Sequence, residues 1–205
     1  MSRYTGPRAR ISRRLGTNIF GTKSEVVALD KRPYPPGEHG RSRRRGNPSE
    51  YLLQLQEKQK ARFSYGLSEK QFRKIYEEAS RREGVTGENM LKFLELRLDN
   101  AVYRAGIAAT RPQARQLVNH GHFDVNGKRV DIPSYRLRKG DIVSLRPKAS
   151  KMVLVQWNVD VLDRQAPVWL QVADSSHEFT VIDLPSRDQI DIPVREQLIV
   201  ELYSK

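Results

Sequence analysis

The chain has 205 residues, and its 37 Lys and Arg against 24 Asp and Glu give a formal net charge of +13. An isoelectric point near 10.1 is typical of a nucleic-acid-binding protein. The sequence has no cysteine, which excludes disulfides, thiolate metal sites and cysteine nucleophiles and suits a cytoplasmic protein. No apolar run approaches the roughly 18 residues of a membrane span, and no secretory signal opens the chain. We therefore expect no membrane partner.

Charge is unevenly distributed along the chain. Residues 1–50 contain 12 basic and 4 acidic side chains, and residues 92–151 contain 13 and 5. By contrast, residues 152–205 contain 4 basic and 9 acidic side chains. Two basic blocks predict two contact regions on one polyanion. The acidic last quarter is better suited to protein neighbours than to RNA, although nothing in it identifies one.

Residues 1–45 are predicted to be a basic N-terminal arm. Residues 32–40 are too rich in Pro and Gly for a helix or a central strand, so we expect an extended arm that becomes ordered against a partner. The alternative is a disordered tail or a localisation signal. Arg outnumbers Lys here, which favours bidentate phosphate contacts. The candidate RNA-binding residues from the pattern of this arm are Arg8, Arg10, Arg13, Arg14, Arg43, Arg44 and Arg45.

Helical periodicity predicts four helices in the middle of the chain. They span about 49–63, 68–84, 86–106 and 110–121, and apolar residues recur at helical spacing in each. The second and fourth begin with a capping box, in which Ser or Thr is followed three residues later by Gln. Gly ends the last three.

The period then changes to two, which indicates strands. Segments 122–125 and 128–130 flank Asn126-Gly127, the pair that best fits a tight hairpin because both turn positions need positive φ. A further strand is predicted over 141–146.

Beyond residue 147 the pattern is weaker. Residues 152–162 fit either a strand or a helix, and the tail over 194–203 fits a helix. Residues 169–172 and 178–182 are predicted strands.

Residues 92–151 form a basic unit of two helices, a hairpin and a strand. Arg97 and Arg104 are seven residues apart, and Arg111 and Arg115 are four apart, so each pair is predicted to share a helix face. Only Glu95 and Asp99 could neutralise the positive charge of such a face. We therefore expect it to bind a phosphate backbone. Further candidates for contacts with phosphate, sugar or base edges are Asn100, Gln116, Asn119, His120, Lys128 and Arg129.

Over essentially its full length the chain resembles the family of the fourth protein of the bacterial small ribosomal subunit. The passages that carry the resemblance are residues 3–7, 35–40, 57–66, 97–104, 115–122, 125–127, 132–135 and 199–205. From the first and third of them the resemblance adds RNA-binding candidates, namely Arg3, Tyr4, Lys58, Lys60 and Arg62.

The resemblance implies an α+β fold with the basic extended arm over residues 1–45. A helical domain over 46–91 would be completed by 186–205. An inserted RNA-binding domain over 92–185 would have its core at 94–151, with two helices packed on a small antiparallel sheet.

The resemblance also implies a function without catalysis. The chain would bind the 5′ domain of small-subunit ribosomal RNA at a multi-helix junction, nucleate assembly and contribute to translational accuracy. Its partners would be ribosomal RNA, neighbouring proteins near the mRNA entry site and possibly mRNA. Some relatives hold zinc through four cysteines in the arm, but Ala9 and Ser12 occupy the first two of those positions. We therefore expect no metal or other cofactor, and an arm ordered by RNA or by local packing.

Other classes of protein remain to be weighed. Leu96–Asp99 resembles the Gly-Arg-Leu-Asp signature of pseudouridine synthases, so the alternative is an RNA-modifying enzyme with the same RNA-binding domain. Leu replaces its Gly, however, and we expect Asp99 to lie on a helix and pair with an Arg.

Residues 16–24 resemble a phosphate-binding loop, but they have one residue too many and no preceding strand. His120 and His122 are close enough to suggest a metal, although closing a helix and starting a strand is the simpler role. A DNA-binding regulator stays open, since two helices before a hairpin imitate a helix-turn-helix.

Overall fold

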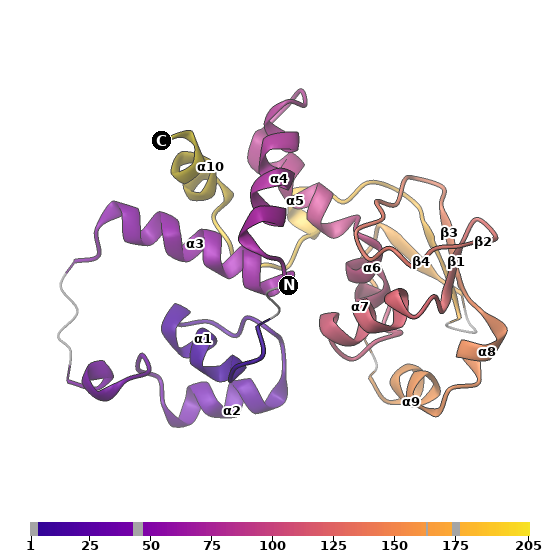
Figure 1. Cartoon of the computed structure of the whole chain (residues 1–205), viewed down its shortest axis with the longest axis horizontal. Coiled ribbons are helices and arrows are strands. Elements are labelled where there is room, and N and C mark those ends of the chain that lie inside the picture. The colour runs from indigo at the N-terminus through magenta and orange to yellow at the C-terminus, as the bar shows by residue number, and fades with distance from the viewer. Residues whose placement is uncertain (1–3, 43–46, 163, 174–176) are drawn as a thin grey trace. The chain divides into compact units, whose positions relative to one another are not determined.

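The computed structural model describes residues 4–42, 47–162, 164–173 and 177–205. The chain divides into two compact units (Figure 1). The first comprises residues 1–78 and 192–205, and the second comprises residues 79–191. The second unit is therefore an insertion in the chain of the first. Helices together with an antiparallel sheet confirm the predicted α+β class.

The first unit is helical. Its elements are α1 (Arg8–Leu15), α2 (Lys23–Lys31), η1 (Glu38–Gly40), α3 (Glu50–Ser64), α4 (Glu69–Ser80), which runs across the boundary, and α10 (Glu196–Ser204). Helix α10 packs along α3, so the end of the chain completes this unit. The Ser49 hydroxyl accepts the Leu52 N–H at 3.3 Å, and Ser68 and Gln71 form the expected reciprocal capping box.

The N-terminal segment contains more helix than its composition predicts. Ile11, Leu15 and Ile19 are buried and pack with Phe20 and Phe63. Ile11 and Leu15 are four residues apart and lie on one side of α1, and Ile19 follows in the loop after the helix ends at Leu15. This small apolar cluster orders α1 and the loop after it, while residues 16–22 and the Pro-rich residues between α2 and η1 form no helix or strand.

A buried carboxylate joins α1 to α2. Glu25 is only 2% exposed and accepts hydrogen bonds from the backbone N–H of Ile19 at 3.0 Å and of Phe20 at 3.1 Å. The Ser12 hydroxyl also donates to it. Local packing and this carboxylate join the helices of the segment over residues 8–31.

The second unit contains the sheet. Its elements are α5 (Thr86–Glu95), α6 (Leu98–Arg104), α7 (Arg111–Asn119), β1 (Phe123–Val125), β2 (Lys128–Arg129), β3 (Ile142–Leu145), α8 (Pro147–Ser150), α9 (Val153–Val161), β4 (Leu170–Val172), β5 (Glu178–Val181) and η2 (Arg187–Gln189). The strand order is β2-β1-β3-β5-β4, with each neighbouring pair antiparallel. The strands predicted near 170 and 180 are confirmed. Residues 152–162, left open between strand and helix, form α9.

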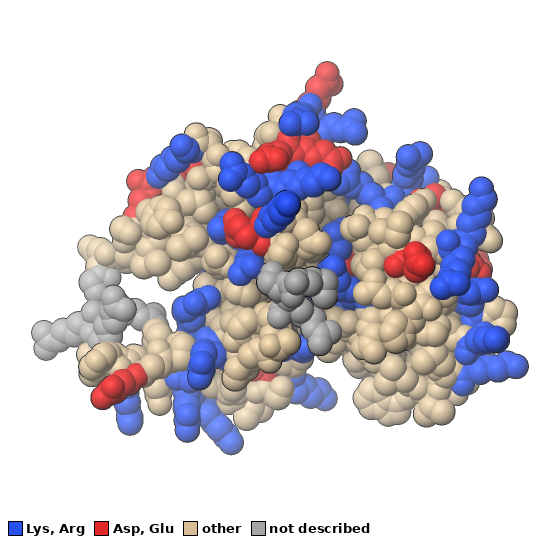
Figure 2. Space-filling view, in the orientation of Figure 1, with Lys and Arg blue, Asp and Glu red and all other residues tan. Residues whose placement is uncertain are grey.

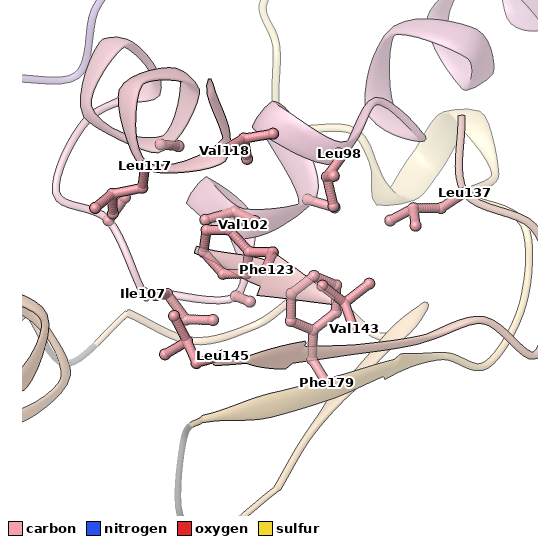
Figure 3. Close-up of a cluster of buried hydrophobic side chains, with 14 of the residues drawn as sticks. Leu98, Val102, Ile107, Leu117, Val118, Phe123, Leu137, Val143, Leu145 and Phe179 are labelled. Atoms are coloured by element: carbon pink, nitrogen blue, oxygen red, sulfur yellow. The ribbon is translucent and has the colours of Figure 1, made fainter. Parts of the chain in front are cut away.

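The core of this unit lies between the helices and the sheet. Figure 3 shows Val102 and Val118 from the helices facing Phe123, Val143 and Phe179 from the strands. All five are at most 1% exposed. Burial of these side chains fixes α6 and α7 on one face of the sheet.

The prediction of one helix over 86–106 is wrong, because the helix breaks at Leu96 and Arg97. Arg97 is extended (φ −66°, ψ 137°) and forms an isolated bridge with Arg136. The Leu137 N–H donates to Leu96 O at 2.9 Å, and the Leu98 N–H donates to Tyr135 O at 2.8 Å. These pairings use backbone groups that a continuous helix would need for itself.

The hairpin prediction is confirmed. Asn126 and Gly127 have φ of 50° and 75°, and Val125 pairs with Lys128. The Asn126 side chain also donates to Asp141 at 2.9 Å and accepts the Ile142 N–H at 3.0 Å, which ties the turn to β3. Among the described residues, no helix is long and apolar enough to cross a membrane.

Candidate RNA-binding surface

Glu95 is the centre of a buried network at the end of α5. Arg104 donates to both of its carboxylate oxygens, at 2.9 and 3.1 Å. The Asn100 amide donates to Glu95 Oε2 at 2.8 Å and in turn accepts from Arg111 Nε at 2.8 Å. Arg104 also reaches Asp191 Oδ2 at 3.3 Å. Glu95 itself is fully buried, so its charge is compensated within the unit.

Asp99 is the centre of a second network at the start of α6. Arg97 binds it in a bidentate manner, with Nε–Oδ1 at 3.0 Å and Nη2–Oδ2 at 2.7 Å. Arg115 reaches Asp99 Oδ2 from α7 at 3.5 Å. The expected pairing of Asp99 with Arg is confirmed, and Asp99 contributes to the structure as an ion-pair partner.

The expectation that Arg97 and Arg104 share one helix face is wrong, because Arg97 precedes α6 as its N-terminal flanking residue. Arg97 is buried and Arg104 nearly so, whereas the Arg115 side chain is about a third exposed. Arg111 and Arg115 on α7 keep part of their surface open to solvent, and so does Arg104 to the smaller extent of 13% of its side chain.

Two guanidinium groups enclose Tyr103 of α6. Arg111 lies 4.4 Å and Arg164 lies 4.0 Å from the ring centroid. Arg164 also donates to the backbone oxygens of Tyr103 at 2.8 Å and Ala108 at 3.1 Å. Burial, followed by the charges of Arg111 and Arg104, lowers the pKa of Arg164. Arg164 is a structural clamp that sequence reasoning missed, since it reaches this site across about 55 residues of chain.

An exposed polar cluster lies where α7 ends and the hairpin begins. We call it the hairpin cluster, and its members are Gln116, Asn119, His120, Lys128 and Arg129, all exposed. Lys128 and Arg129 form no ion pair with another described residue. Gly121 has a φ of 68°, in the left-handed region that favours glycine, and the Arg129 guanidinium lies beside it. Lys and Arg side chains follow this edge of the unit, near β2 (Figure 2).

His122 and Arg146 extend the hairpin cluster. The Arg146 N–H donates to His122 O at 3.0 Å, and Arg146 Nε lies 3.5 Å from Asp124 Oδ1. The His120 and His122 rings have centroids 5.9 Å apart. Partial burial, then His120, Arg129 and Arg146, lower the pKa of His122. Sequence reasoning missed Arg146 as a site residue because the β1–β3 register, not local spacing, brings it here.

In the first unit the predicted residues of α1 differ in role. Arg13 Nε donates to Arg32 O at 3.0 Å and Tyr34 O at 3.1 Å, so it holds the Pro-rich segment. Arg8 lies 5.5 Å from the centroid of the Phe20 ring. Tyr4, Arg10 and Arg14 are exposed to solvent. The Tyr4 hydroxyl donates to Pro7 O at 3.1 Å. Arg3, Arg43, Arg44 and Arg45 lie outside the described residues.

The basic side chains at the end of α3 are paired with acids. Lys58 Nζ and the Tyr203 hydroxyl each lie 2.8 Å from Glu69 Oε1. Arg62 Nε lies 3.8 Å from Glu69 Oε2, and Lys60 binds Glu57 at 2.6 Å.

These contacts shift the titration of the groups involved. Burial works to raise the pKa of Glu69, but the hydrogen bonds from Lys58 and Tyr203 and the positive charges of Lys58 and Arg62 lower it overall. Burial and the Glu69 carboxylate raise the pKa of Tyr203, while burial lowers the pKa of Arg62.

Comparison with known proteins decides the family. The description "Ribosomal protein S4/S9 N-terminal domain" matches residues 3–95, and "S4 domain" matches residues 96–143. The small ribosomal subunit protein uS4 of Corynebacterium efficiens is 58% identical over 206 residues, covering 100% of both chains. Those of Mycobacterium avium and Corynebacterium glutamicum are each 57% identical with the same coverage. The chain belongs to the uS4 family.

Membership of the uS4 family excludes the enzymatic alternative, because this is a family of structural ribosomal proteins. The buried ion pairs of Asp99 agree with that. Residues 16–24 are not preceded by a strand: helix α1 ends at Leu15, and Gly16 caps it in the left-handed conformation. Among the described residues, no group of three or more His, Asp or Glu is placed to hold a metal ion. The hairpin cluster lies within the part of the chain that matches the S4 domain.

Proposed function

We propose that this uS4-family chain binds the ribosomal RNA of the small subunit, with residues 92–185 as its RNA-binding domain and 94–151 as the core of that domain. The hairpin cluster is the observation that carries the proposal. It combines two exposed cations, which form no ion pair with any residue that the structure describes, with amide and imidazole groups. These groups suit phosphate, sugar and base-edge contacts on RNA.

The arginine networks beside the cluster support the same proposal. Glu95 and Asp99 hold Arg97 and Arg104 in the interior, so these two stiffen the corner between α6 and α7. Arg111 and Arg115 are oriented by Asn100 and Asp99, and both residues are partly exposed. Pre-oriented donors lose less side-chain entropy when a phosphate arrives.

We further propose the finer role that the family resemblance implies. The chain would bind the 5′ domain at a multi-helix junction, nucleate assembly of the small subunit and contribute to translational accuracy. Its location would be the ribosome in the cytoplasm. Neighbouring proteins near the mRNA entry site, and mRNA itself, complete the proposed partners. Exposed cations in both units, including Arg10 and Arg14 in the first, support a two-region contact with RNA.

Equilibrium binding of the full-length chain to a 5′-domain transcript tests the proposal. Lys128→Ala combined with Arg129→Ala should weaken binding by about tenfold or more, since each neutralised phosphate contributes to the affinity. Arg73→Ala is the matched control, because this exposed cation of α4 already pairs with Glu77 at 3.1 Å. Equal affinity for duplex DNA, or an unchanged double variant, would contradict the proposal.

Reconstitution of small subunits tests the assembly role. Particles assembled without the chain should lack early protection of the 5′ domain, and adding the wild-type chain should restore it. A misreading reporter measures the accuracy role separately, so that either role can fail alone.

A further inference from the structure

Helix α9 has apolar side chains on its outer face as well as its inner one. Val153, Trp157 and Val161 are 80%, 54% and 55% exposed, and Leu154 is 46% exposed. The first three are four residues apart, so they form one stripe along the helix. Contiguous exposed apolar side chains of this kind mark interaction surfaces.

The inner face of α9 is already used by the fold. Val155 and Asn158 are buried, and the Asn158 amide donates to Ile107 O at 3.1 Å. The exposed stripe is thus left over after α9 has packed on its own unit. On the face shown in Figure 2, the surface over α9 is mostly free of blue and red side chains. We call Val153, Leu154, Trp157 and Val161 the α9 stripe.

The charges around the α9 stripe disfavour RNA as its occupant. Every nucleotide brings a phosphate, but α9 contains no Lys or Arg, and its one charged side chain is the exposed Asp160. Asp160 makes no ion pair with another described residue. Lys148 and Lys151 lie before the helix, at the end away from Val161. An apolar surface beside an acid fits a protein surface that is apolar at its centre and basic at its rim.

We propose that the α9 stripe is a docking surface for another protein of the small subunit, one that presents apolar side chains to the stripe and a Lys or Arg to Asp160. The proposed occupant is therefore a basic protein neighbour, and crosslinking to RNA or to a second copy of this chain would contradict the proposal. This inference rests on the proposed incorporation into the small subunit, and it adds a protein contact to the RNA contacts made elsewhere.

Photo-crosslinking in purified small subunits identifies the occupant. A full-length chain with Trp157→benzoylphenylalanine should crosslink to another protein, at apolar residues next to a Lys or Arg. The same replacement at Val85, an exposed apolar residue before α5, gives the background. A product with ribosomal RNA, a product with a second copy of the chain, or no product above that background would overturn the proposal.

Charge reversal at Asp160 gives an independent test, because it should lower incorporation if the occupant is a basic protein and raise it if the occupant is RNA. When the Asp160→Lys chain competes with the wild-type chain, it should be incorporated into small subunits severalfold less, because the new Lys repels a basic protein neighbour. Asp160→Asn should have a smaller effect. Improved incorporation of Asp160→Lys would indicate RNA and contradict the proposal. Affinity for the isolated 5′-domain transcript should not fall in either variant. If the wild-type chain failed to bind that transcript, the proposed RNA-binding function would fail instead.

Discussion

Arginine has two roles in the second unit, and burial separates them. Arg97 is 5% exposed and bidentate to Asp99, whereas Arg129 is exposed and forms no ion pair with a described residue. A buried charge that loses its partner is costly, while an exposed cation can be removed with little effect on folding. Sequence spacing treats the two as equivalent because it contains no information on burial.

Arg97→Ala should therefore destabilise the second unit by about 3 kcal/mol or more, because Asp99 is left buried with only the longer Arg115 contact. Arg129→Ala should change stability by less than about 0.5 kcal/mol and weaken RNA binding instead. Urea unfolding of both variants gives the comparison. A smaller loss of stability for Arg97→Ala than for Arg129→Ala would refute the structural role.

His122 should make the stability of the second unit depend on pH. Its pKa is lowered in the folded chain by burial and by His120, Arg129 and Arg146, so the unfolded chain takes up this proton first. Stability is then lost as the pH falls through the ordinary histidine value of about 6.5 towards the folded value. Thermal unfolding of wild type and His122→Asn from pH 8 to pH 5 should show a steeper fall for wild type. Parallel curves would argue against this coupling.

At the scale of elements, the N-terminal segment and the break after α5 show where periodicity and composition were insufficient. The apolar residues Ile11, Leu15 and Ile19 are visible in the sequence, but the high density of Arg and Pro around them obscured the cluster. The break at Arg97 has no local signal, because its cause is the backbone of residues 135–137. The capping box of α4 and the Asn126-Gly127 turn were predictable, since their hydrogen bonds and dihedral angles are local. The box predicted for α7 forms only in part, because the Thr110 hydroxyl accepts the Gln113 N–H while the Gln113 side chain accepts the Ala109 N–H.

Glu25→Ala should break the contact between α1 and α2 and destabilise both helices. It leaves the Ser12 hydroxyl and the N–H groups of Ile19 and Phe20 without their acceptor, at a cost of about 2–4 kcal/mol. Hydrogen exchange should then rise in residues 8–31, while the second unit keeps its protection. Glu38→Ala, at an exposed carboxylate, is the control, and equal exchange in the two variants would count against the buried role of Glu25.

At the scale of the whole molecule, the net charge of +13 predicts strong salt dependence of RNA binding. If about 6–10 phosphates are neutralised, affinity should fall by about 10³–10⁵-fold between about 50 and 200 mM salt. Binding isotherms at several salt concentrations give the slope, and the double variant Lys128→Ala with Arg129→Ala should reduce it by about two. A nearly flat response would mean that phosphate neutralisation is not the main source of affinity.

The sequence by itself determined the α+β class, the caps of α3, α4 and α7, the hairpin and the family, because these depend on spacing and on residue type. Only the tertiary structure decided which cations are available to RNA. Glu95 pairs with Arg104, Asp99 pairs with Arg97, and Glu69 pairs with Lys58. The packed elements bring these partners together. It also decided that Arg146 joins His122 and that the outer face of α9 stays uncovered. The physical reason is that a charge or an apolar side chain acquires its role from the groups packed around it, and those groups are distant in the chain.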